Sequence, residues 1–204
     1  MKNPSTHSRF ERGFTIMELL MVMVLIAVLL GLGGPAFQSS LERNRMQSTV
    51  SGLAGSLAFA RAEAVIRTQP VSMCPTLNDV DCSGSNWESG VLVFVDDGDG
   101  TGASALDGSL DGNEELLRIV DAAPVDITIR TSGFVNNSSL VFTDSGRVLQ
   151  GANGTFAICD GRGATSARGL IVEVSGQARL AVDTDSNGIV QDHTASGGAD
   201  LVCP

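Results

Sequence analysis

The feature that most constrains this chain is an uncharged apolar segment near its amino terminus. No charged residue occurs between Leu19 and Leu41, and residues 19–34 are nearly all apolar. An α-helix rises 1.5 Å per residue, so about 20 such residues cross the roughly 30 Å hydrocarbon core of a membrane. Residues 1–13 contain three basic residues and one acidic residue. The positive-inside tendency therefore predicts that residues 1–13 lie in the cytoplasm and the rest of the chain lies outside it.

One carboxylate, Glu18, lies at the start of this apolar segment. A carboxylate inside a membrane span costs about 2.5–3.5 kcal/mol on insertion scales, which favours a functional role. Cleavage after Gly13 would create an amine on Phe14, four residues before Glu18. This spacing places both groups on one helix face, where the amine could neutralise the carboxylate. The same amine could instead pair with Glu18 of a neighbouring copy.

The segment Gly13-Phe14-Thr15-Ile16-Met17-Glu18-Leu19-Leu20, followed by the apolar span and by Pro35, resembles the start of type IV pilins and pseudopilins. The resemblance implies that a prepilin peptidase cuts between Gly13 and Phe14 and methylates the new amine. It also implies that Glu18 guides the subunit from inner-membrane lipid into a filament of pilins or pseudopilins. The protein would cross the bacterial inner membrane once, with its carboxyl-terminal domain in the periplasm. A plain signal anchor with a chance acid is the alternative.

The remaining sequence predicts an α+β protein in which a long helix packs on an antiparallel β domain. We expect a leader over residues 1–13, a transmembrane helical part over 14–34, an amphipathic helical part over 35–69, and a periplasmic β-rich domain over 70–204. Pro35 removes one helical hydrogen bond, but helix-forming sequence continues to about Arg67. An apolar stripe at helical spacing predicts the buried face of that helix: Met46, Val50, Leu53, Leu57, Ala60 and Ala64.

Short β-rich runs follow Pro70, separated by clusters of Gly, Asn, Asp and Ser, which is typical of an antiparallel β domain. The predicted strands are Pro70–Cys74, Gly90–Val95, Glu115–Val120, Asp126–Thr131, Ser139–Phe142, Thr155–Cys159, Gly169–Val174 and Ala178–Val182.

Within this domain the order of several short motifs resembles the GspH/FimT family. The motifs are Trp87-Glu88-Ser89-Gly90, Val93-Phe94-Val95-Asp96, Glu115-Leu116-Leu117-Arg118, Phe142-Thr143-Asp144-Ser145-Gly146-Arg147, Thr155-Phe156-Ala157-Ile158-Cys159 and Ile171-Val172-Glu173-Val174-Ser175-Gly176. The family contains pseudopilin H of type II secretion and minor pilins of type IV pili. The resemblance implies a place at or near a filament tip and a role in starting filament assembly. It leaves open which of the two systems this chain serves.

Four cysteines, Cys74, Cys82, Cys159 and Cys203, all lie on the side predicted to be extracytoplasmic. An even number there predicts two disulfides with three possible pairings. We favour Cys74–Cys82 and Cys159–Cys203. A zinc site is the alternative, although the sequence contains no C-x-x-C motif.

Two loops are rich in acidic residues and glycines. In the second, Asp183, Asp185, Asn187 and Gly188 follow the order of the first half of a calcium-binding loop. The twelfth position is Thr194 rather than Glu, and solvated turns have the same composition. The two interpretations of this loop are therefore a calcium site at Asp183, Asp185 and Asn187 and a series of solvated turns. Calcium is a weaker interpretation for the loop that starts at Asp96. Apart from calcium, no cofactor is expected.

Catalysis and DNA binding have little support in the sequence. His193 follows Asp192 in a Gly/Ser-rich tail, and no phosphate-binding loop or hydrolase motif is present, so we expect no enzyme.

Some FimT-like proteins capture DNA through a Gly-Arg-x-Arg stretch, and here only Arg179 matches it, in Gly176-Gln177-Ala178-Arg179. The net charge of −10 also opposes phosphate binding. DNA uptake is therefore the alternative function.

Overall fold

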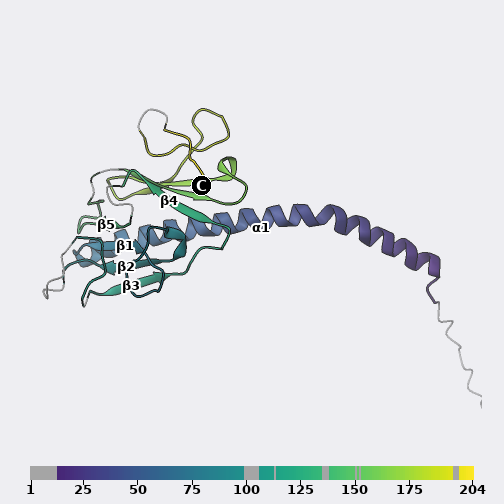
Figure 1. Cartoon of the computed structure of the whole chain (residues 1–204), viewed down its shortest axis with the longest axis horizontal. Coiled ribbons are helices and arrows are strands. Elements are labelled where there is room, and N and C mark those ends of the chain that lie inside the picture. The colour runs from purple at the N-terminus through teal and green to yellow at the C-terminus, as the bar shows by residue number, and fades with distance from the viewer. Residues whose placement is uncertain are drawn as a thin grey trace, which may run out of the picture. The chain divides into compact units, whose positions relative to one another are not determined.

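The computed structural model describes residues 13–98, 106–112, 114–134, 138–149, 151, 153–194 and 198–204, and only the backbone of residues 32–36. Of the predicted leader, only Gly13 lies within these ranges. The chain divides into two units, Met1–Arg43 and Asn44–Pro204. The second unit contains every strand that the structure describes (Figure 1).

Helix α1 (Ile16–Arg67) begins three residues after Gly13 and continues through Pro35, as the sequence predicts. Its first turn is capped by Thr15, whose hydroxyl accepts a hydrogen bond from the backbone N–H of Glu18 at 3.2 Å. The helix ends where Thr68 takes a left-handed conformation with φ of 54°, and the Gln69 N–H closes the last turn on the Ala64 carbonyl at 3.3 Å.

Eight strands form two antiparallel four-stranded sheets. The first, sheet A, has the order β3-β2-β1-β5 and contains β1 (Val71–Pro75), β2 (Val91–Val95), β3 (Leu116–Val120) and β5 (Leu140–Phe142). The second, sheet B, has the order β4-β6-β7-β8 and contains β4 (Thr128–Ser132), β6 (Gly154–Cys159), β7 (Arg168–Val172) and β8 (Ala178–Leu180). Two short 3-10 helices, η1 (Trp87–Ser89) and η2 (Ala164–Ser166), connect strands.

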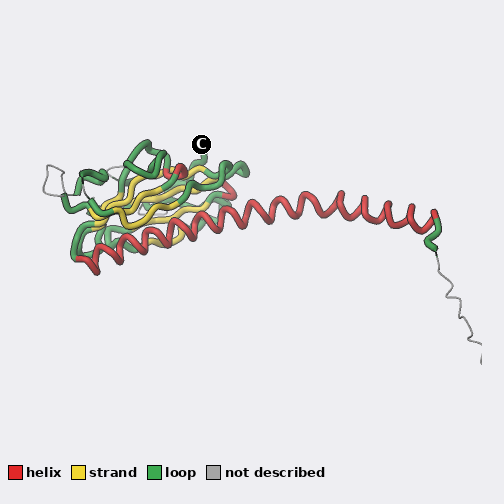
Figure 2. Tube along the Cα trace, turned by 90° about the horizontal axis from the view of Figure 1, so that it is seen from below, coloured by secondary structure: helices red, strands yellow, loops and turns green. Residues whose placement is uncertain are grey.

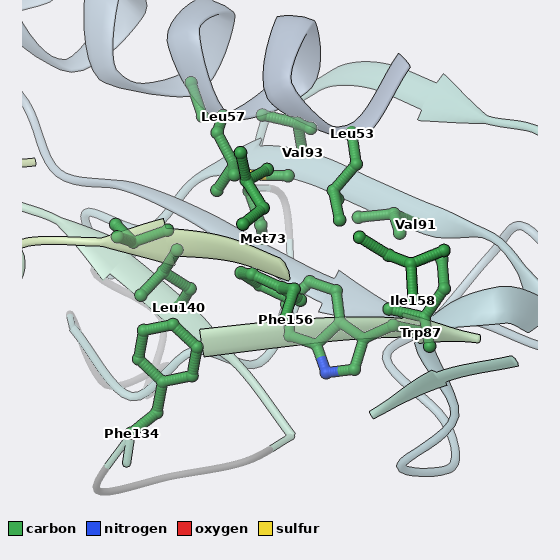
Figure 3. Packing of buried hydrophobic residues seen from close by; sticks show 14 of the residues in the cluster. Leu53, Leu57, Met73, Trp87, Val91, Val93, Phe134, Leu140, Phe156 and Ile158 are labelled. Atoms are coloured by element: carbon green, nitrogen blue, oxygen red, sulfur yellow. The ribbon is translucent and has the colours of Figure 1, made fainter. Parts of the chain in front are cut away.

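The main core of the second unit lies between α1 and the two sheets. All six residues of the predicted stripe are buried in it, so the amphipathic face of the helix is confirmed. Figure 2 shows the strands lying along the carboxyl-terminal part of the helix. At the centre of the core, the rings of Trp87 and Phe156 meet edge to face at 4.9 Å between centroids (Figure 3).

Two strand boundaries differ from the prediction for identifiable reasons. Strand β4 begins at Thr128 rather than Asp126, because Pro124–Ile127 forms a turn in which the Ile127 N–H donates to the Pro124 carbonyl at 2.9 Å. Strand β8 ends at Leu180 rather than Val182, because the Val182 carbonyl accepts a hydrogen bond from Gln191 in the carboxyl-terminal segment. Turn chemistry and a long-range contact therefore decide where these two strands begin and end.

Candidate functional site

The predicted processing and assembly residues stand at the start of α1. Gly13, Phe14 and Thr15 precede the helix, and Phe14 is exposed. Glu18 lies in the first turn, with its backbone N–H bound to Thr15. Acidic side chains favour the first turn because the helix dipole is positive there. The Gly13–Phe14 bond therefore lies in exposed, non-helical backbone, and Glu18 lies in the first turn of the helix that follows.

The side chains of α1 from Ile16 to Gly31 are exposed and mostly apolar. The span predicted over residues 14–34 includes residues 32–34, whose side chains lie outside the described part. In the described part of the chain, no helix is both long enough and apolar enough to cross a membrane.

All four cysteines form disulfides, Cys74–Cys82 and Cys159–Cys203. These are the pairings that the sequence favours, and they leave no thiol for zinc. Cys74 lies in β1 and joins a small second core with Leu92 and Phe94 on the other face of sheet A. Cys159 ends β6, so the second disulfide ties the carboxyl terminus to sheet B.

Asp96 anchors the start of the first acidic loop. Its carboxylate is fully buried and accepts hydrogen bonds from the Ser72 hydroxyl at 2.5 Å and from the Leu106 and Gly108 N–H groups at 2.6 and 2.9 Å. Residues 99–105 lie outside the described residues. Burial raises the pKa of Glu114, at the end of the loop, although backbone N–H groups oppose the shift. In the described part of this loop, the Asp96 carboxylate therefore holds the loop in place through its hydrogen bonds.

The second acidic loop is closed by its own donors. The Gly188 and Ser186 N–H groups bind the Asp183 carboxylate at 2.8 and 2.7 Å, and the Gly188 contact is the main reason why the pKa of Asp183 is lowered. The buried Gln191 amide donates to Asp185 at 3.1 Å and to Asp200 at 2.9 Å. Asn187 also donates to both of these acids.

These donors occupy carboxylate oxygens that a calcium ion would use. Within the described ranges, no three acidic, histidine or cysteine side chains are placed so that they could hold a metal. Calcium at Asp183, Asp185 and Asn187 stays a prediction. Sequence reasoning missed Gln191, and a single glutamine carries no local signal for such a role.

In the described part of the chain, Arg179 is paired with an acidic side chain. The Arg179 guanidinium pairs with Glu173 at 3.0 Å, and both side chains are about half exposed. Arg162 also pairs with an acidic residue, Asp160 of its own turn, at 2.9 Å. Burial raises the pKa of the Asp160 carboxyl, but the contacts from Arg162 outweigh it and hold the pKa below its ordinary value.

His193 fastens the carboxyl-terminal segment to β6. Its Nδ1 lies 3.0 Å from the Thr155 hydroxyl, and its backbone N–H donates to the same oxygen at 2.9 Å. Thr155 is fully buried, and the imidazole lies against Gly133, where an added Cβ would come within 2.1 Å of the ring. These contacts give His193 a structural place in the fold.

The turns at Gly146 and Gly176, which end two of the short motifs, both pack against Arg61 of α1. Sequence reasoning missed this contact. Gly146 and Gly176 both have positive φ values, 72° and 78°. The Arg61 Nε of α1 donates to the Gly146 carbonyl at 3.0 Å, and a Cβ on Gly176 would lie 1.9 Å from that same oxygen. The motifs Asp144-Ser145-Gly146 and Ser175-Gly176 are thus two turns packed against each other and against the helix.

Comparisons with known proteins agree with this fold. Residues 49–178 match the family model described as type II transport protein GspH, and residues 8–33 match the prokaryotic N-terminal methylation motif. The type IV major fimbrial protein FimA of Dichelobacter nodosus is 29% identical over 154 residues, which are 74% of this chain and 88% of that protein.

Solved structures of a minor pilin and of a minor pseudopilin are similar to this chain. The type IV minor pilin FimU of Pseudomonas aeruginosa superposes with a TM-score of 0.51 at 25% identity, over 68% of this chain and 90% of that one. The minor pseudopilin EpsH from the type 2 secretion system of Vibrio cholerae gives a TM-score of 0.45 at 10% identity, over 69% of this chain and 99% of that one.

Proposed function

Because this chain belongs to the GspH family of pilin-like transport proteins, we propose that it is a minor pilin or pseudopilin placed at or near the tip of a type IV pilus or a type II secretion pseudopilus. There it helps to start filament assembly. The observation that carries the proposal is the amino-terminal segment: residues 8–33 match the methylation motif, and helix α1 begins within them, at Ile16. The protein acts by assembling with other pilins or pseudopilins rather than by catalysis.

The start of α1 supports processing at the Gly13–Phe14 bond. Residues 13–15 lie in non-helical backbone, where a prepilin peptidase can reach the bond. The Thr15 cap holds the helix start in place once the leader has gone, because it lies on the mature side of the cut. The new amine on Phe14 then stands beside the first turn, which contains Glu18.

Glu18 supplies the charge that directs assembly. Before assembly the apolar helix is anchored once in the inner membrane, with the leader in the cytoplasm and the carboxyl-terminal domain in the periplasm. A carboxylate in hydrocarbon needs a partner, because an isolated charge there costs several kcal/mol. The Phe14 amine of the same or of a neighbouring subunit is that partner, and the neighbour's amine provides the attraction that recruits the subunit.

The test compares the Glu18→Ala variant with the wild-type chain in a host that assembles the filament. We expect the variant to enter the membrane and lose its leader normally but to be absent from the filament fraction. The Ser48→Ala variant, at an exposed position on the same helix, is the matched control and should assemble normally. Normal amounts of the Glu18→Ala chain in filaments, with normal piliation or secretion, would count against the proposal.

A further inference from the structure

One face of sheet B bears a row of side chains beside a small pocket. Strand register places Thr155, Ile171 and Arg179 opposite one another across β6, β7 and β8. Side chains that are opposite in neighbouring strands point to the same face of the sheet. The next side chains along two of these strands, Phe156 and Leu170, lie in the main core, so the row faces away from that core.

The pocket lies between β8 and the carboxyl-terminal segment and has a volume of about 340 Å³. Sites for small molecules usually measure roughly 300–1,000 Å³, so this one is large enough for a single small group. The buried Ile171 and the exposed Val182 give it an apolar side. Polar side chains form much of the remaining lining, among them Asn153, Arg179, Asp192 and His193.

Each of these four polar side chains is held by one atom and has another polar atom to spare. The Asn153 Oδ1 accepts a hydrogen bond from the Val174 N–H at 2.9 Å. The Arg179 Nε donates to the Glu173 carboxylate at 3.0 Å. Among the described residues, the Asn153 Nδ2 and the terminal amines of Arg179 have no hydrogen-bond acceptor. Both side chains are therefore fixed in place with N–H donors to spare.

Asp192 and His193 are held in the same way on the carboxyl-terminal segment. The Asp192 Oδ1 accepts from the Thr194 hydroxyl at 2.7 Å and from the Thr194 and Ala199 N–H groups at 2.9 and 3.0 Å. Burial raises the pKa of Asp192, but these bonds outweigh it and lower the pKa, so Oδ2 is an anionic acceptor. The Thr155 oxygen already accepts from the His193 N–H, so its own proton points to Nδ1 and the ring proton lies on Nε2. Within the described ranges, neither Oδ2 nor Nε2 has a hydrogen-bond partner.

The spare atoms determine which chemistry fits the pocket. Three of the four side chains offer N–H donors, whereas Asp192 offers one free carboxylate oxygen. Asp192 and the Glu173 that pairs with Arg179 disfavour an anion, because like charges repel at this range. A metal ion is disfavoured as well, because Asp192 is the only carboxylate among the described lining residues. The pocket therefore fits a neutral group that accepts several hydrogen bonds, donates one and has an apolar part.

We propose that this pocket binds an N-acetylhexosamine residue of a saccharide. The acetamido carbonyl accepts from Asn153 and Arg179, and the acetamido N–H donates to Asp192. The acetamido methyl group lies against Val182, and a ring hydroxyl accepts from the Nε2 of His193. A sugar ring carries its polar groups around its edge, as this pocket does, whereas an extended peptide presents its amides in a line along about 3.3 Å per residue. The site lies in the second unit and does not depend on the proposed function.

NMR of the full-length chain tests this binding, with isotope-labelled histidine rings and micelles of a detergent that contains no sugar. The chain has two histidines, His193 at the pocket and His7 before the Gly13–Phe14 bond, so His7 is an internal reference. The probe is triacetylchitotriose, and maltotriose, which lacks acetamido groups, is the control sugar. We expect triacetylchitotriose alone to shift the His193 signals to saturation, with a Kd on the order of 1 mM, and to leave the His7 signals in place.

Two arginine variants locate the binding. Arg179→Gln should weaken binding about 10-fold, because it removes a charged hydrogen-bond donor. Arg168→Gln, at another exposed arginine of sheet B, is the matched control and should bind as the wild type does. Both positions are exposed, so both variants should fold, and an unchanged melting curve of Trp87 emission checks this.

Three results would overturn the proposal. The first is the absence of any shift of the His193 signals at about 10 mM triacetylchitotriose. The second is an equal shift with maltotriose, and the third is equal weakening by the two arginine variants. Each of these results would leave the proposed function standing, because that function is tested separately at Glu18.

Discussion

Replacing Gly176 with alanine tests the contact between the two turns and the helix. The new Cβ would lie 1.9 Å from the Gly146 carbonyl oxygen, which is backbone and cannot rotate away. A non-glycine residue at φ of 78° costs roughly 1–2 kcal/mol. The displaced oxygen also loses its hydrogen bond from the Arg61 guanidinium, worth about 1.5–3 kcal/mol. We therefore expect a loss of about 3–5 kcal/mol in the free energy of unfolding.

The fluorescence of Trp87 measures this loss directly. It is the only tryptophan of the chain and is 2% exposed in the core of the second unit, so its emission follows the unfolding of that unit. For a unit of this size, each kcal/mol lowers the melting temperature by about 2–4 °C, which predicts a drop of roughly 6–20 °C.

The Gly188→Ala variant separates the clash from the backbone strain. Gly188 also has a positive φ, 89°, but an added Cβ would meet nothing within 4 Å. We expect a loss of about 1–2 kcal/mol there. Equal losses at the two positions would refute the packing of the two turns.

Three further predictions concern charged groups. The pKa of Asp160 is lowered in the folded protein, so its pairing with Arg162 stabilises the fold above the ordinary carboxyl pKa of about 3.9 and is lost as the pH falls below it. The Arg162→Ala variant should therefore melt earlier than wild type at pH 7, with a smaller difference at pH 3, and a constant difference would contradict this. Calcium binding at Asp183, Asp185 and Asn187 predicts a melting temperature that rises with added calcium and falls in EGTA, and no shift would exclude it. Because Arg179 is paired with Glu173, we expect no retardation of DNA in gel shifts at low salt, and retardation that is abolished by Arg179→Ala would contradict this.

Local patterns predicted much of the fold. The stripe from Met46 to Ala64 is visible in sequence because helical spacing alone determines which side chains share a face. Each predicted strand has a counterpart in the structure, because turn residues interrupt the apolar runs.

Long-range contacts account for what sequence reasoning missed. Nothing near Gln191 indicates that its amide will bind Asp185 and Asp200, because these partners meet only when the carboxyl-terminal segment folds back. Gly146 and Gly176 both pack against Arg61 of the helix, although each lies 85 or more positions after Arg61 in the sequence. The division of eight strands into two sheets depends in the same way on pairings such as β1 with β5, which are distant in sequence.

The amino terminus of the assembled protein tests the central claim most directly. Lys2 is the only lysine in the sequence, so removal of residues 1–13 leaves the Phe14 amine as the only primary amine of the chain. Mass spectrometry of the chain recovered from a sheared filament fraction should give an amino-terminal peptide that begins at Phe14 and contains one added methyl group. A filament-associated chain that begins at Met1, or at any residue other than Phe14, would contradict the account.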